Sequence, residues 1–176
     1  KETGTKRSRG RGTAPPAAKD EVEREAPRER QITEPQKVGE VTFTQDGRAY
    51  VPNLLPQKWG EKAPSRFTSL EEANAHDLKQ RDKLLEYFTD FDKVLLSEET
   101  DIPLSKLYSY QSHVQKKDVS QIAKAFDMDE YRKGGVPIVF KLPDGSFLLK
   151  DGNHRVNAAM LNGVDQLPFK LFGFSK

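Results

Sequence analysis

The sequence predicts an α+β fold, a small mixed sheet with flanking helices, preceded by a tail that has no core of its own. Short apolar runs flank Asp-Gly turns at two places, near residue 46 and near residue 144, which is typical of paired strands. Separate stretches show helical spacing of apolar residues. The chain is 35% hydrophobic, enough for one sizeable core, but its mean hydropathy of −0.79 is low for a chain that packs throughout.

Residues 1–39 have the composition of a tail. They contain four prolines, ten Lys or Arg residues, seven Asp or Glu residues and no aromatic side chain. Such a segment cannot bury enough apolar surface to offset the entropy lost on ordering, so we expect it to be disordered unless a partner orders it. Its basic run is typical of arms that neutralise nucleic-acid phosphates and consists of Lys6, Arg7, Arg9 and Arg11. A solubilising tail is the alternative, since acidic residues follow and the net charge of the chain is only +2.

Residues 40–68 are expected to form a hairpin and an extended arm. Strand-like residues at 41–44 and 48–51 flank Gln45-Asp46-Gly47, and a proline-containing stretch at 52–56 leads to Trp59. An arm of this kind could clasp a neighbour. We therefore expect a protein partner to order residues 1–68.

Residues 69–97 are predicted to form one long amphipathic helix added to the domain that follows. Ser69-Leu70-Glu71-Glu72 has the pattern of a capping box. The apolar residues after it recur at heptad-like spacing, namely Leu84, Phe88, Phe91 and Leu95. We interpret this stripe as facing the core of the domain, with a partner interface as the alternative.

The most functional-looking stretch lies at a strand-to-helix junction within residues 98–176. Two predicted strands, at 136–142 and 146–150, are joined by Pro143-Asp144-Gly145, and helical spacing then runs from Asn153 to a stop at Gly163. The junction itself consists of Asp151, Gly152, Asn153, His154 and Arg155.

A junction of this kind can bind an anion. The first backbone N–H groups of a helix lack internal partners and carry partial positive charge, and a preceding glycine lets the chain turn sharply enough to expose them. Arg155 could add a bidentate fork to phosphate oxygens, and His154 could donate a hydrogen bond or transfer a proton near neutral pH. The alternative is an ordinary turn, in which Asn153 is a helix cap and Arg155 a solvated charge.

The junction stands in a longer ordered series of features. These are Ile102-Pro103-Leu104, the segment 107–114 with Gln111, a helix near 119–126, Val136-Pro137-Ile138-Val139, the Asp144-Gly145 hairpin, the junction with Ala158-Ala159, and Gly163 before Leu167-Pro168-Phe169-Lys170-Leu171. In this order they resemble the ParB/sulfiredoxin superfamily, the ParB-like nuclease domain, over about 70 of the 176 residues. The resemblance implies that Gly152, Asn153, His154 and Arg155 bind nucleotide phosphates, with His154 and Arg155 as catalytic residues.

Departures from the family narrow the function. Its members include CTP-hydrolysing partition proteins, nucleotide-using sulfinic acid reductases, a free-serine kinase and proposed nucleases. This chain has Asn153 where the reductases have a cysteine, and no cysteine elsewhere, so it lacks the thiol that their reaction needs. It also ends at Lys176, without the DNA reader of partition proteins, so we do not expect partition activity.

Several functions remain open after these exclusions. They are nucleotide hydrolysis, phosphotransfer, nuclease activity, and the binding of nucleotide or DNA phosphate alone. The alternative from a different class is a structural adaptor, for instance a phage protein within a virion, that is anchored by its tail and retains only a vestigial site.

Other polar residues are candidates for the same site. The resemblance implies that Gln111 and His113 lie beside the nucleotide. The alternative interpretation is that they belong to an edge strand and are solvated. The expected ligand is a nucleoside triphosphate or ADP with Mg²⁺, for which Asp151, Glu98 and Glu99 are candidate metal ligands.

The sequence has no cysteine, no apolar run of about 20 residues and no signal-peptide pattern. These features limit where in the cell the protein is expected. We expect a soluble cytoplasmic or virion protein that follows no disulfide-dependent secretory route and has no membrane partner.

Overall fold

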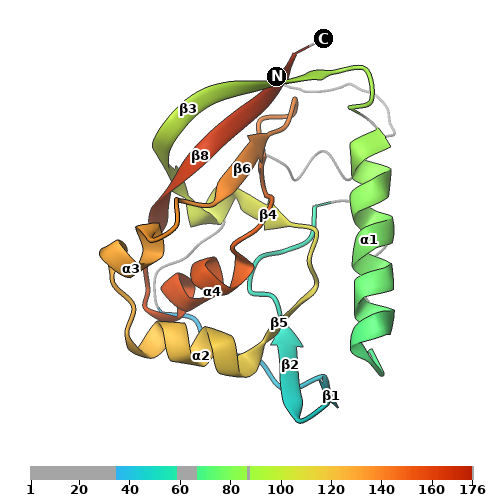
Figure 1. The fold of residues 1–176 in the computed structure, drawn as a ribbon, viewed down its shortest axis with the longest axis vertical. Coiled ribbons are helices and arrows are strands. Elements are labelled where there is room, and N and C mark those ends of the chain that lie inside the picture. Colours follow the sequence, from blue (N-terminus) through green and yellow to red (C-terminus); the bar gives the residue numbers. More distant parts are fainter. Residues whose placement is uncertain (1–34, 59–66, 87, 176) are drawn as a thin grey trace, which may run out of the picture.

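A computed structural model describes residues 35–58, 67–86 and 88–175. Over these residues the chain has the predicted α+β class, with two sheets and four α-helices (Figure 1). The basic run Lys6, Arg7, Arg9 and Arg11 and the arm residue Trp59 lie outside the described residues. No helix in the described part is both long enough and apolar enough to cross a bilayer.

The larger sheet has five strands in the order β3-β8-β6-β7-β4. They are β3 (Asp92–Pro103), β4 (Leu107–Ser109), β6 (Ile138–Lys141), β7 (Phe147–Leu149) and β8 (Gln166–Ser175). The pairs β3–β8 and β6–β7 are antiparallel, whereas β6–β8 and β4–β7 are parallel. The sheet is therefore mixed, as predicted, and β6 and β7 are the two strands expected around Asp144-Gly145.

A smaller sheet holds the predicted N-terminal hairpin. Strands β1 (Phe43–Gln45) and β2 (Arg48–Pro52) are antiparallel, and β2 pairs with β5 (His113–Gln115). The turn residues Asp46 and Gly47 both have positive φ, 53° and 77°, which is the conformation of the two-residue turns that match strand twist. Residues 43–52 are therefore bound within the fold of this same chain.

The four helices differ in length and place. They are α1 (Leu70–Glu86), α2 (Lys116–Lys124), α3 (Met128–Arg132) and α4 (Asn153–Leu161), and a short 3-10 turn, η3 (Leu104–Lys106), follows β3. In Figure 1 α1 runs along one side of the molecule, while α2, α3 and α4 gather on the other. The predicted stop of α4 is confirmed: Gly163 has φ 75°, its N–H donates to Met160 O, and Val164 N–H donates to Ala159 O.

The predicted helix over 69–97 is too long. It starts as expected, with Glu72 N donating to Ser69 Oγ at 3.1 Å, but α1 ends at Glu86, and residues 92–97 belong to β3. There the backbone pairs with β8, from Asp92 opposite Ser175 to Leu95 opposite Phe172, so strand hydrogen bonds replace helical ones. Leu95 is accordingly 44% exposed on β3 and is not part of a helical core stripe.

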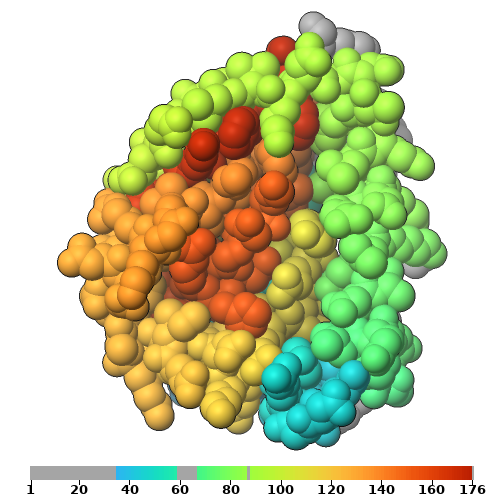
Figure 2. Space-filling model, viewed as in Figure 1, coloured from blue at the N-terminus to red at the C-terminus, as the bar shows by residue number. Residues whose placement is uncertain are grey.

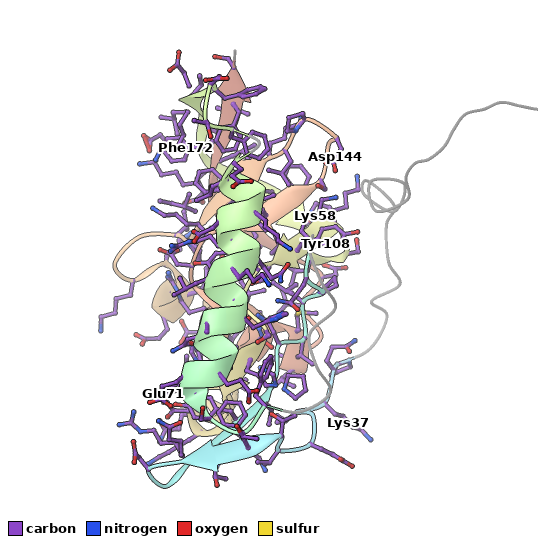
Figure 3. All side chains as sticks on the ribbon, turned by 90° about the vertical axis from the view of Figure 1, so that its right-hand side faces the viewer. Lys37, Lys58, Glu71, Tyr108, Asp144 and Phe172 are labelled. Atoms are coloured by element: carbon purple, nitrogen blue, oxygen red, sulfur yellow. The ribbon has the colours of Figure 1, made fainter. Side chains whose placement is uncertain are left out.

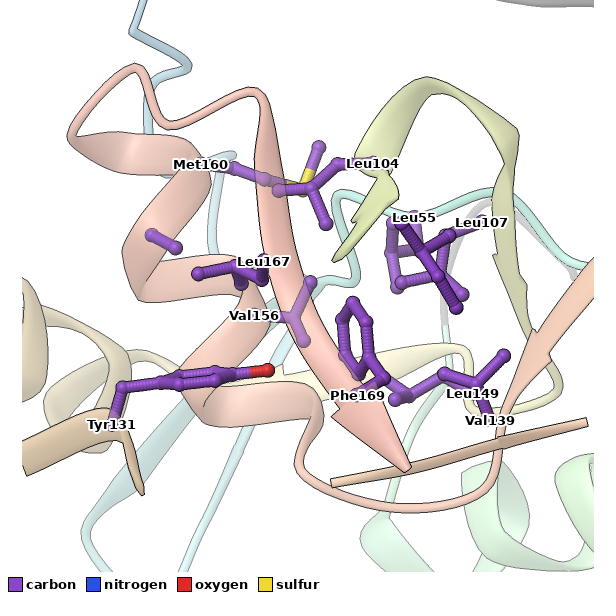
Figure 4. Close-up of a cluster of buried hydrophobic side chains, with 12 residues drawn as sticks. Leu55, Leu104, Leu107, Tyr131, Val139, Leu149, Val156, Met160, Leu167 and Phe169 are labelled. Carbon is purple, nitrogen blue, oxygen red and sulfur yellow. The ribbon is translucent and has the colours of Figure 1, made fainter. Parts of the chain in front are cut away.

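The main hydrophobic core lies between one face of the large sheet and α4 (Figure 4). Val139 and Leu149 are directly paired across β6 and β7 and are fully buried, as are Val156 and Ala159 of α4. Tyr131 of α3 closes one end of this core, where its hydroxyl donates to Pro168 O at 2.9 Å. Burial raises the pKa of Tyr131 far above its usual value.

The opposite face of the sheet is covered by α1. Because side chains alternate along a strand, the neighbouring pair Phe140 and Leu148 faces away from α4 and packs with Leu84 and Phe88. The Phe88 ring stacks on that of Phe174 with centroids 4.3 Å apart. The predicted packing of this helix on the domain is thus confirmed for its C-terminal end.

The end of the arm is anchored at the β6–β7 turn. Lys58 is only 6% exposed, and its Nζ lies 2.8 Å from Asp144 Oδ2 and 5.1 Å from the Tyr108 ring centroid (Figure 3). Burial alone would raise the pKa of Asp144, but hydrogen bonds from Lys58 and Ser146 outweigh it and lower the pKa.

The middle of the buried stripe of α1 is polar. Asp77 and Gln80 are 6% and 2% exposed, between the apolar contacts of Ala73 and Leu84. Asp77 Oδ2 accepts a hydrogen bond from Ser112 N at 3.0 Å, but Asp77 Oδ1 and both amide atoms of Gln80 find no hydrogen-bond partner among the residues that the structure describes. Burial raises the pKa of Asp77 despite the hydrogen bond from Ser112.

Replacing Asp77 by asparagine should leave the protein at least as stable at pH 7, with a gain of about 1 kcal/mol. Since the native pKa lies above the usual value of 3.8, the native state binds this proton more tightly than the unfolded state. The tighter binding of this proton stabilises the native state fully below about pH 4, and this stabilisation is lost as pH rises through the native pKa of Asp77. Urea unfolding of the wild type and Asp77→Asn at pH 4 and pH 7 measures the difference, with the exposed Asp82→Asn as control. A variant that is less stable than the wild type at pH 7 would contradict the expected cost of the buried carboxylate.

Candidate functional site

The junction between β7 and α4 turns at Gly152. This residue precedes the first residue of α4 and has left-handed backbone angles, φ 85° and ψ 21°. A Cβ added to it would lie 2.9 Å from both Cβ and Cγ of Pro137, so conformation and contact both require glycine. The helix cap is therefore Gly152 and not Asn153, which is already helical.

The first turn of α4 presents free backbone donors. Val156 N–H makes the first helical hydrogen bond, to Gly152 O at 3.0 Å. Gly152 has no side chain that could accept from the turn, and the N–H groups of Asn153, His154 and Arg155 have no acceptor among the described residues. The start of α4 thus has the partial positive charge expected of an uncapped helix.

The side chain of Asn153 points into the protein. It is 3% exposed, and its Oδ1 accepts hydrogen bonds from Asn53 Nδ2 and Ser109 Oγ, both at 2.8 Å. Its Nδ2 donates to Gln111 Oε1 at 3.3 Å. The amide therefore joins the arm, β4 and α4, and only the backbone of Asn153 is left for an anion.

A second asparagine of α4 completes this network. Asn157 Oδ1 accepts from Leu54 N at 2.8 Å, and its Nδ2 donates to Asn53 Oδ1 at 2.9 Å and to Asn153 O at 2.8 Å. The arm at 53–57 therefore packs on α4 of its own chain, where the sequence suggested a neighbour. Neither Asn53 nor Asn157 was predicted; the only signal was the spacing of four residues between Asn153 and Asn157, which places both amides on one face of α4.

His154 is held as a neutral hydrogen-bond acceptor. Its Nε2 accepts from Gln115 N at 3.1 Å, so the proton of the neutral ring lies on Nδ1. Burial lowers the pKa of His154, and the nearby Asp118 opposes this only in part. Because Nε2 is occupied, His154 is placed to donate from Nδ1 and not to accept a proton at Nε2.

Arg155 carries a charge that no carboxylate of the described residues neutralises. Its Nη1 donates to Tyr131 O at 2.7 Å and to Gly135 O at 2.9 Å, and the guanidinium lies 5.5 Å from the Tyr131 ring centroid. Its Nη2 lies 3.5 Å from the position of a Cβ added at Gly152, so the guanidinium folds back over the start of α4. No ion pair to Arg155 is formed within the described residues.

The two other candidates for nucleotide contact are placed differently. Gln111 lies beside Asn153, and its Nε2 donates to His113 O at 2.8 Å. His113 is 8% exposed, and its ring lies 5.4 Å and 5.0 Å from the rings of Phe43 and Phe67. Burial lowers its pKa. The structure therefore brings Gln111 to α4 and places His113 in a hydrophobic cluster behind it.

The candidate metal ligands are not gathered. Glu98 and Glu99 lie on β3 and pair with Lys170 at 3.5 Å and Arg132 at 3.2 Å, whereas Asp151 is exposed next to Gly152. In the part of the chain that the structure describes, no group of three or more His, Cys, Asp or Glu residues could hold a metal ion. Of the three candidates, only Asp151 belongs to the junction.

Comparison with known proteins identifies no relative of this chain. No protein-family model, curated protein or solved structure matches the chain.

Alanine at Gly152 should destabilise the fold more than alanine at another left-handed glycine. Gly134 has φ 80° with open space around it, so Gly134→Ala measures the conformational cost alone, about 1–2 kcal/mol. Gly152→Ala adds the contact with Pro137 and should cost at least about 1 kcal/mol more. Equal losses in urea unfolding would show that Pro137 moves aside without cost.

Replacing His154 by glutamine should flatten the pH dependence of stability between pH 7 and pH 5. Because the native pKa lies below the usual 6.5, the unfolded state binds this proton first, so the stability is complete above about pH 6.5 and is lost as pH falls through the native pKa. Gln Oε1 can still accept from Gln115 N and does not titrate. The measurement is urea unfolding at pH 5, 6 and 7. Burial also lowers the pKa of His113, so His113→Gln is the matched comparison. If stability depends on pH in His154→Gln as it does in the wild type, the lowered native pKa of His154 is contradicted.

Proposed function

We propose that the start of α4 binds the phosphate groups of a nucleotide or of a nucleic acid. The observation that carries the proposal is the position of Arg155. Its charge lies over the uncapped first turn of α4 and has no carboxylate partner in the part of the chain that the structure describes. Backbone N–H groups at a helix start favour negative charge, and a guanidinium adds directed charge-assisted hydrogen bonds to phosphate oxygens. A nucleotide ligand is further supported by the resemblance of residues 102–171 to the ParB/sulfiredoxin superfamily.

The guanidinium is held ready for such a ligand. Two carbonyl groups fix Nη1, which leaves Nη2 and Nε to contact an anion without loss of side-chain freedom on binding. Carbonyl partners orient the group but do not cancel its charge. Arg155 therefore serves both the fold of the α3–β6 loop and, in this proposal, the recognition of phosphate.

The residues of the junction have different roles in this proposal. The backbone of Gly152 to Arg155 and the Arg155 guanidinium bind phosphate oxygens, and His154 donates from Nδ1. Magnesium, which nucleotide phosphates usually bring, would be held by the phosphates, with Asp151 as the one carboxylate of the junction. Hydrolysis, phosphotransfer or strand cleavage at this site requires a base, and the exposed Asp151 is a better candidate for that role than His154, whose Nε2 is occupied.

The adaptor role within a virion rests on the tail at residues 1–39, of which 1–34 lie outside the described residues, and on the arm. Since the arm at 53–57 is bonded to α4 of the same chain, it gives this alternative no support. We therefore place phosphate binding first.

Arg155→Ala should weaken nucleotide binding by about tenfold or more, because a charge-assisted hydrogen bond contributes about 1.5–3 kcal/mol. Titration calorimetry with CTP, ATP and ADP in the presence of Mg²⁺ measures the affinity. Arg132→Ala, which removes an exposed arginine of the neighbouring α3, is the matched control and should bind as the wild type does. Arg155→Lys keeps the charge while losing the fork, and thermal unfolding of each variant checks that the fold is intact. Absence of binding heat from the wild type with all three nucleotides would refute the proposal in its nucleotide form.

A further inference from the structure

Strand β3 forms an open edge of the large sheet. It is the end strand of the order β3-β8-β6-β7-β4, and no described strand pairs with its outer side. In Figure 1 it runs along the outside of the molecule. The opposite edge, at β4, is covered by the arm, where Ser109 N donates to Pro56 O at 2.9 Å and Gln57 forms a parallel bridge with Ser109. Because an end strand presents backbone N–H and C=O groups outward, β3 can pair with a further strand.

Three consecutive apolar side chains are exposed on this edge. Val94, Leu95 and Leu96 are 39%, 44% and 51% exposed, and they make up half of the large exposed hydrophobic side chains among the described residues. Val94 and Leu96 line a groove of about 430 Å³ beside Gly173. Figure 2 shows atoms of β3 along the rim of the molecule, with atoms of β8 exposed beside them. A run of this kind on a sheet edge marks a site for association with another strand.

Lys93 does not shield this edge, although edge strands are often protected by a lysine. Its Nζ lies 5.2 Å from the centroid of the Phe172 ring and 5.8 Å from that of Phe140, so its side chain folds back over the sheet. The bulges of β3 begin only after Leu95, and residues 92–95 keep a regular register with residues 172–175 of β8. The start of β3 is therefore both regular and accessible.

The charged side chains of β3 complement a second β3 that runs in the opposite direction. Leu95 pairs with Phe172, so it shares a face of the sheet with Lys93. Glu98 lies on the same face, since it is 3.5 Å from Lys170 Nζ, which lies over the same ring at 5.7 Å. With a two-fold axis at Leu95, this leucine packs on its own copy. Lys93 of each copy then lies near Glu98 of the other.

The opposite face of the strand is complementary as well. Val94 and Leu96 both point to the groove beside Gly173, so the same axis brings Val94 of each copy to Leu96 of the other. Glu99 is paired with Arg132 at 3.2 Å within its own chain, which reduces the repulsion between the acidic residues of two copies. Apolar pairs at the centre and opposite charges at the ends are the contacts that stabilise antiparallel strands.

We propose that two copies of this chain pair through β3 as antiparallel strands, with a two-fold axis at Leu95, so that their large sheets become one. A two-fold contact uses the same patch on both copies and closes on itself. The arm covers the other edge of each sheet, so the paired sheet does not grow further. The proposal uses none of the residues of the junction at Gly152 and is independent of phosphate binding.

Sedimentation equilibrium of the full chain tests the dimer. The wild type should show a reversible monomer–dimer equilibrium. Leu95→Lys places two positive charges next to each other at the axis and should raise the dissociation constant by about tenfold or more. Leu85→Lys makes the same substitution on α1 at a leucine that is also 44% exposed, so it is the matched control and should dimerise as the wild type does.

A cysteine at the axis tests the register, because the chain contains no other cysteine. Directly opposite residues of antiparallel strands have Cα atoms about 4.5–5.5 Å apart, a separation that a disulfide bridges. Under mild oxidation Leu95→Cys should therefore form a disulfide-linked dimer on a non-reducing gel, whereas Leu85→Cys should stay largely monomeric.

Three outcomes overturn the proposal. A wild type that is monomeric at every concentration leaves β3 open or covered by a strand other than a second β3. A dimer that Leu95→Lys does not weaken forms through a different surface. A disulfide that forms as readily in Leu85→Cys as in Leu95→Cys reports random collision and not pairing at the axis.

Discussion

The fold and the candidate site both depend on the buried amide of Asn153. This one side chain joins the arm at Asn53, strand β4 at Ser109 and the loop at Gln111 to the first residue of α4. A polar group so deeply buried is costly unless it is hydrogen-bonded, and each of its bonds reaches a segment that is distant in the sequence. By holding the start of α4 at a fixed place, the amide also sets where the free N–H groups of that helix point.

The sequence predicted those parts of the fold that depend on contacts between residues close together in the chain, and it missed parts that depend on distant contacts. The hairpin at Asp46-Gly47, the strands around Asp144-Gly145 and the stop of α4 at Gly163 are decided by residues next to one another, and each was predicted. The end of α1 was not, because the apolar spacing runs on through Phe88 and Phe91 although the backbone leaves the helix to pair with β8. That pairing depends on residues 166–175, about 70 positions further along the chain, and no local pattern reports it.

The candidate site shows the same division. The glycine turn and the helix start could be predicted from Gly152 alone, since they follow from local conformation. The direction of each side chain could not. Asn153 turns inward because Asn53 lies opposite, and His154 accepts from Gln115. Arg155 is fixed by the carbonyl groups of Tyr131 in α3 and of Gly135 in the α3–β6 loop. Each partner is at least 20 residues away in sequence. The result is an arginine whose position is determined by the fold while its charge remains available.

The position of β8 in the large sheet has a consequence for how the protein folds. Among the described strands, β8 is the last in sequence, yet it lies second in the sheet, between β3 and β6. The two halves of the sheet therefore cannot join until β8 is present, and its pairing with β3 must close a long loop. A high contact order of this kind predicts slow folding, with the apolar face of β6 and the inner edge of β3 uncovered until β8 has paired with them.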